Sequence, residues 1–114
     1  MHELSIAKSL VNLALKEAAG QSRPVVAVHI KVGALSGVVD DALQSAYQYV
    51  CEATPLAGSQ LIIENIPVQI FCEDCRKTTI LSGIQSFICS DCGKASADLR
   101  AGRELDLVAL EVSG

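Results

Sequence analysis

FCEDCRKTTILSGIQSFICSDCGK, residues 71–94, is the stretch around which the chain is organised. It contains two Cys-x-x-Cys pairs separated by thirteen residues. Two thiolates at this spacing can reach one ion from a single turn, and a second pair completes the tetrahedron that Zn²⁺ prefers. The spacing therefore predicts a zinc ribbon whose ligands are Cys72, Cys75, Cys89 and Cys92.

Two other uses of paired cysteines are the alternatives, namely two disulfides or a redox-active Cys-x-x-Cys. A redox pair needs no second pair, and it usually follows a strand and opens a helix. Here residues 78–81, TTIL, follow the first pair and are typical of a strand. A site made of four cysteines also leaves no coordination position open for water or substrate, which indicates a structural metal.

Composition and charge narrow the class of protein. With 114 residues, half of them hydrophobic, the chain can form one small domain with a metal-held insert. Its net charge of −4 argues against a nucleic-acid binder. We expect no signal peptide and no membrane span, because no basic segment precedes an apolar run and no long apolar run occurs.

Zinc thiolates require reduced cysteines, which suits the cytoplasm. The fifth cysteine, Cys51, is expected to be a small buried apolar residue.

Hydrophobic periodicity predicts the order of the secondary-structure elements. We expect helices over 3–19 and 41–53, the second capped by Asp40, and strands over 25–32, 59–65 and 105–112. The last strand has no obvious partner inside the ribbon. The predicted fold is therefore α+β, a three-stranded sheet with two helices on one face, plus an inserted zinc-ribbon module. Residues 1–67 and 102–114 would form the α+β domain, and residues 68–101 the ribbon.

The amino terminus offers a second set of metal ligands. The α-amine of Met1 with the backbone amide and the imidazole of His2 can form fused chelate rings around one ion. Glu3 can add its amide nitrogen or its carboxylate. Nitrogen-rich planar sets suit Ni²⁺ or Cu²⁺. From spacing alone, an incidental histidine at a chain end remains the alternative.

Several common catalytic groupings are missing from the sequence. There is no glycine-rich phosphate loop, and no serine or cysteine has an evident base partner. His29 is expected to be a side chain on a half-exposed strand, and helix capping accounts for Asp40 and Asp41. We therefore expect that the chain is not an enzyme.

Four segments together resemble one family. MHELSIAKSL at 1–10, VGALSGVVDDAL at 32–43, the two cysteine pairs, and AGRELDLVALEV at 101–112 resemble the HypA/HybF nickel metallochaperones of NiFe-hydrogenase maturation. The resemblance covers essentially the whole chain. It implies a nickel-binding α+β domain, a zinc ribbon, and delivery of Ni²⁺ to the hydrogenase large subunit. It also implies a HypB-type GTPase as a partner, and urease maturation proteins as partners for some members.

Carried over to this sequence, the resemblance makes His2 the nickel ligand, with the Met1 amine and the amides of His2 and Glu3 beside it. It makes the four paired cysteines the zinc ligands. The family usually has acidic residues where this chain has Ala34 and Val39, which leaves open whether Asp40 or Asp41 contributes to nickel binding. The competing hypothesis is a zinc-ribbon module that binds protein or nucleic acid without transferring nickel. The sequence does not choose between a monomer and a homodimer.

Overall fold

The computed structural model describes residues 2–114, which divide into two compact units. The first unit combines the N-terminal residues up to Ile30 with Val38–Glu64 and Asp106–Gly114. The second combines Lys31–Gly37 with Asn65–Leu105. Among the described residues, no helix has the length and apolar character needed to cross a membrane.

Two amphipathic helices pack against each other in the first unit. Helix α1 (Glu3–Glu17) buries an apolar stripe made of Ala7, Leu10, Val11 and Ala14. Helix α2 (Asp40–Cys51) buries Leu43, Tyr47 and Cys51, which lie four residues apart on one face. Both stripes have the helical spacing that the sequence predicts, and Cys51 is buried as expected.

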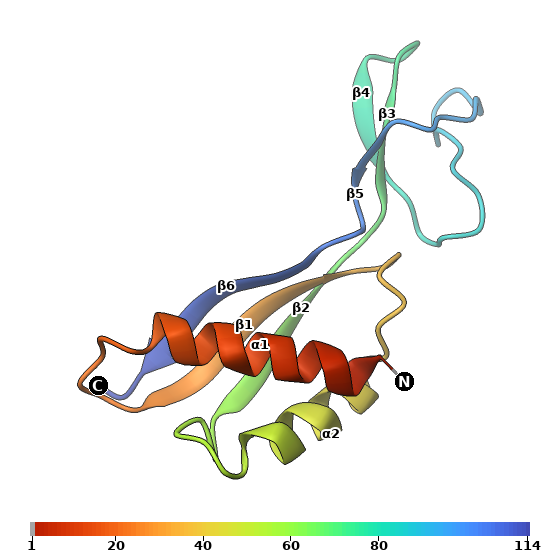
Figure 1. Cartoon of the computed structure of the whole chain (residues 1–114). Coiled ribbons are helices and arrows are strands. Elements are labelled where there is room, and N and C mark those ends of the chain that lie inside the picture. The colour runs from red at the N-terminus through yellow and green to blue at the C-terminus, as the bar shows by residue number, and fades with distance from the viewer. Residues whose placement is uncertain (1) are drawn as a thin grey trace. The chain divides into compact units, whose positions relative to one another are not determined.

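Most of a three-stranded sheet in the order β2-β1-β6 lies in the first unit. Its strands are β1 (Val25–Gly33), β2 (Gln60–Ile66) and β6 (Leu105–Val112). Figure 1 shows both helices on the same face of this sheet. Strand β6 follows the cysteine module in the sequence and pairs with β1, so the predicted α+β fold is confirmed.

The start of α2 differs from the sequence expectation. Asp40 is the first helical residue and not the N-cap, a position occupied by Val39 without any side-chain cap. The Glu3 carboxylate accepts a hydrogen bond from the backbone N–H of Val39 at 3.1 Å. A side chain of α1 thus accepts a hydrogen bond from the N-cap backbone N–H of α2, the donor that a glutamate of the same helix binds in a capping box.

The second unit contains a smaller sheet in the order β4-β3-β5. Strand β3 (Gln69–Cys72) pairs antiparallel with both β4 (Lys77–Ile80) and β5 (Leu99–Ala101). The sequence predicts a strand directly after the first cysteine pair, where β4 lies, but no strand at the residues of β5. Their pattern is too short and too polar for a strand, and only pairing with β3 reveals one.

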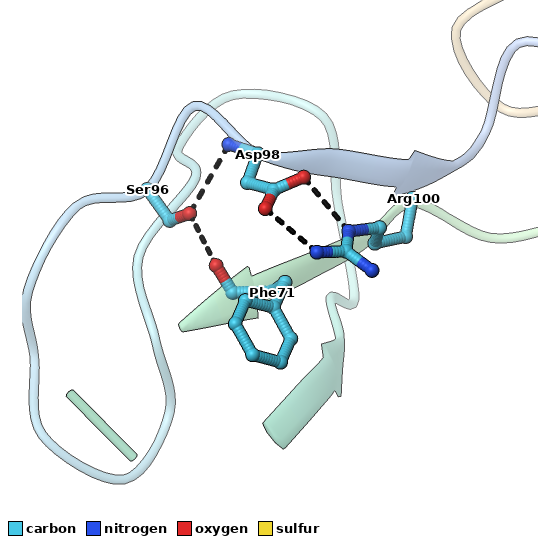
Figure 2. Close-up of polar contacts among 4 residues, drawn as sticks. All are labelled: Phe71, Ser96, Asp98 and Arg100. Atoms are coloured by element: carbon cyan, nitrogen blue, oxygen red, sulfur yellow. Dashed lines mark hydrogen bonds and ion pairs between the residues drawn. The ribbon is translucent and has the colours of Figure 1, made fainter. Parts of the chain in front are cut away.

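A polar clasp outside the cysteines attaches β5 to β3 (Figure 2). The Ser96 hydroxyl donates to the Phe71 carbonyl at 2.6 Å, and the backbone N–H of Asp98 donates to the Ser96 oxygen at 3.2 Å. Arg100 donates twice to the Asp98 carboxylate at 2.8 Å and lies 4.5 Å from the centre of the Phe71 ring. The clasp therefore fixes the strand that ends at Cys72.

Candidate metal centres

Four cysteine side chains converge at one point of the second unit. The ligand sulfurs of Cys72, Cys75, Cys89 and Cys92 all lie within 4.8 Å of one another. Across the two pairs, the Cys72 and Cys92 sulfurs are 3.6 Å apart and those of Cys75 and Cys89 are 3.9 Å apart. A tetrahedral ion with Zn–S bonds of about 2.3 Å requires sulfurs about 3.8 Å apart. The donor set and its spacing therefore fit Zn²⁺.

Backbone donors prepare the cluster for an ion. The N–H of Cys92, followed by that of Asp91, donates to the Cys89 sulfur and lowers the pKa of this thiol to about 6. Contact with the Cys92 sulfur, together with burial, raises the pKa of Cys75 to about 12. A divalent cation bound by these sulfurs would stabilise all four thiolates together.

Two ion pairs next to the cysteines are not part of the sequence prediction. Lys77 pairs with Asp91, and Lys94 pairs with Asp74. Each pair joins a residue beside one Cys-x-x-Cys to the aspartate inside the other. The signal that could have revealed them is the repeated pattern Cys-x-Asp-Cys-x-Lys, at 72–77 and 89–94.

The predicted nickel ligands lie at the start of α1. His2 is exposed and precedes the first helical residue, and its carbonyl accepts the N–H of Ile6 at 2.9 Å. Glu3 is buried, and its hydrogen bond from Val39 is the main cause that lowers its pKa. The Glu3 side chain is thus engaged with the α2 entrance, whereas the imidazole of His2 lies at the surface. Met1 lies outside the described residues.

The structure brings Glu3 close to the α2 entrance, where Asp40 follows Val39 in the chain. His29, the other histidine, lies on β1 and pairs with Glu111 of β6 at 2.5 Å. It is therefore held by the sheet and is not part of the N-terminal group. The N-terminal group belongs to the first unit and the four cysteines to the second.

Comparisons with known proteins agree with this architecture. Residues 1–112 match the family model described as HypA: Hydrogenase/urease nickel incorporation, metallochaperone, hypA. A hydrogenase maturation factor HypA from Chloroflexus aurantiacus is 48% identical over 113 residues, covering 97% of this chain and 98% of that protein. The factor of the same name from Desulfosudis oleivorans is 39% identical over 114 residues, covering 98% of both.

Two solved structures share the fold. The solution structure of the Ni metallochaperone HypA from Helicobacter pylori matches with a TM-score of 0.65 and 23% identity, covering 98% of this chain and 97% of that one. A second solution structure of HypA protein matches with a TM-score of 0.69 and 25% identity, covering 99% and 97%. The sequence resemblance is thus confirmed across nearly the full length, and the chain belongs to the HypA family of nickel-incorporation metallochaperones.

Proposed function

We propose that this chain binds Ni²⁺ at its amino terminus and delivers it to the large subunit of a NiFe-hydrogenase during maturation in the cytoplasm. In this proposal the ion is cargo and the chain catalyses no reaction. The observation that carries the proposal is an exposed His2 at the first turn of α1 in a chain of a nickel-incorporation family. A HypB-type GTPase is the proposed partner, and urease maturation proteins are the alternative recipients.

The start of a helix suits the proposed nickel ligands. The first four N–H groups of an α-helix have no intrahelical acceptor. The amides of His2 and Glu3 can therefore lose their protons to bind Ni²⁺ without breaking a helical hydrogen bond. The positive end of the helix dipole also favours the anionic, deprotonated amides. A set at a chain end can release its ion with little rearrangement of the folded protein.

The second metal in the proposal is Zn²⁺, held by Cys72, Cys75, Cys89 and Cys92. The fit of the sulfur spacing to a tetrahedral ion supports it. When bound, the ion cross-links the two cysteine pairs and stabilises the fold. The small sheet of this module has only three short strands, so metal binding would supply much of its stability. We propose residues 68–101 as this separate ribbon module.

The chain has two histidines, of which only His2 is a proposed nickel ligand, so His29 can serve as the matched control. In untagged protein, His2→Ala should abolish the Ni²⁺ binding measured by titration calorimetry, whereas His29→Ala should leave affinity and stoichiometry unchanged. An appended N-terminal tag should weaken binding as well, because it removes the free α-amine from its position. Unchanged nickel binding in His2→Ala would eliminate the N-terminal site.

A further inference from the structure

The two cysteine turns are copies of each other in conformation as well as in sequence. We call residues 72–77 the first knuckle and residues 89–94 the second. Arg76 and Gly93 occupy equivalent positions, and both have positive φ, 56° and 76°. The strand pairing also repeats, because Phe71 pairs with Thr78 while Ile88 pairs with Ala95, seventeen residues further along.

The ion pairs follow the same repeat but cross between the copies. Lys77 of the first knuckle pairs with Asp91 of the second, and Lys94 of the second pairs with Asp74 of the first. We call these two contacts the cross-knuckle ion pairs. The four side chains are 45% to 70% exposed, so each contact alone is weak. Both contacts connect the first knuckle to the second, so they act together on any movement of one knuckle against the other.

The relative twist of the knuckles decides which metal geometry the four sulfurs can adopt. In a tetrahedron, the line joining the two sulfurs of one knuckle is perpendicular to that of the other. In a square plane the two lines are coplanar, so one knuckle must rotate by about 90° against the other to reach the planar geometry typical of Ni²⁺. Such a rotation displaces Lys77 from Asp91 and Lys94 from Asp74 together.

We propose that the cross-knuckle ion pairs reserve the cysteine site for zinc by resisting the twist that planar nickel coordination requires. The inference rests on the proposed function, in which nickel is cargo and zinc is structural. A chaperone that handles nickel has to keep it out of its own tetrathiolate site. Lys77, Lys94, Asp74 and Asp91 are thus positioning residues that act on metal choice through the knuckles and touch no ion themselves.

Metal competition in untagged full-length protein tests this inference. Apo protein is loaded with Ni²⁺, and Zn²⁺ is added while the absorption of nickel–thiolate charge transfer is recorded. The N-terminal nitrogen ligands give no such band, so the signal reports the cysteines alone. The double variant Lys77→Met/Lys94→Met should retain nickel until the zinc concentration is about three- to tenfold higher than for the wild type. Its band should also move toward that of a planar complex.

Matched variants distinguish an effect of the cross-knuckle ion pairs from a general effect of net charge. Asp74→Asn/Asp91→Asn should shift the competition in the same direction, although it changes net charge in the opposite sense. Combining all four substitutions should cause no further shift, because each pair is already broken. Lys77→Arg/Lys94→Arg should behave as the wild type, and so should Lys8→Met/Lys16→Met on α1.

Two results would overturn the inference in distinguishable ways. If wild-type protein holds zinc but the lysine and aspartate variants compete as it does, or shift in opposite directions, the cross-knuckle ion pairs do not select the metal. If metal analysis of the wild type finds no zinc at the cysteines, the structural zinc of the proposed function fails, and the inference fails with it.

Discussion

The Glu3 carboxylate connects the first turn of α1 to the entrance of α2. Its bond to the backbone N–H of Val39 spans 36 positions in the sequence. Glu3 is 9% exposed, although it lies beside the chain end. A buried carboxylate in a hydrogen bond holds its neighbours in place, and here those neighbours include His2. Glu3 is thus part of the proposed nickel site through its backbone amide, while its side chain connects the two helices.

Replacing Glu3 by glutamine tests this task. Glu3→Gln removes the charge that strengthens the bond to Val39, so the midpoint temperature of unfolding should fall by about 3 °C. Glu17→Gln, on the exposed side of the same helix, is the control and should leave the midpoint unchanged. The measurement is thermal unfolding followed by circular dichroism at neutral pH. Equal midpoints for both variants and the wild type would show that the bond does not stabilise the fold.

Tyr47 and Tyr49 form a second matched pair. The Tyr47 hydroxyl is buried 2.6 Å from the Ser59 hydroxyl, whereas Tyr49 is 68% exposed on the same helix. Tyr47→Phe should lower the free energy of unfolding by about 1 kcal/mol, as is typical for one lost buried hydrogen bond. Tyr49→Phe should have no measurable effect. Urea unfolding of the two variants checks this, and similar losses in both would contradict it.

Burial also gives Tyr47 a predictable effect on alkaline stability. Desolvation raises the pKa of Tyr47 from 10.0 to about 12 in the folded chain. The folded state therefore holds the phenol proton more tightly than the unfolded state does. This contribution to stability is fully present below pH 10 and is lost as the pH rises from 10 to 12. The fall in unfolding free energy over that range should be less steep in Tyr47→Phe, and parallel curves would refute the assignment.

At the scale of elements, close backbone contacts in the second unit depend on glycine. A Cβ added to Gly33, at the end of β1, would lie 2.2 Å from the carbonyl carbon and oxygen of Gly102. The two segments are also joined by hydrogen bonds, from Gly33 to Glu104 at 2.7 Å and from Leu35 to Gly102 at 2.7 Å. A side chain at position 33 would therefore separate the ends of strands that the fold brings together.

Alanine substitutions at two glycines test this contact. Gly33→Ala should lower the free energy of unfolding by about 3 kcal/mol, because backbone atoms have to move to admit the methyl group. Gly20→Ala is the control, since nothing lies within 4 Å of its added Cβ and its φ is ordinary. It should be neutral or slightly stabilising. Chemical denaturation distinguishes the two, and a neutral Gly33→Ala would show that the contact relaxes easily.

At the scale of the whole molecule, the proposed nickel and zinc ligands belong to different compact units. Cys75→Ser should abolish zinc binding and unfold the ribbon, while the helical signal and the stoichiometry of bound nickel remain. His2→Ala should abolish nickel binding but leave the ribbon folded with one zinc per chain. Metal analysis and circular dichroism of both variants check this prediction. Loss of both metals in either variant would show that the units fold as one.

A structural feature of this chain can be predicted from the sequence when the residues that determine it are close together in the sequence. The helices follow from periodicity within a dozen residues, and the gathering of the cysteines follows from two short motifs. Strand β5 was missed because its three residues become a strand only beside β3. The capping role expected of Asp40 was wrong because the helix begins one residue earlier than expected, so that Val39 is the N-cap and Asp40 the first helical residue.

Sequence alone therefore determined the helices, the strands of the larger sheet and the cysteine cluster, since periodicity and Cys-x-x-Cys spacing act locally. Only the tertiary structure decided that Glu3 serves the α2 entrance and that each knuckle lysine pairs with the opposite aspartate. These contacts join residues 14 to 36 positions apart. A polar side chain has many possible partners at such separations, and packing of the surrounding chain selects one.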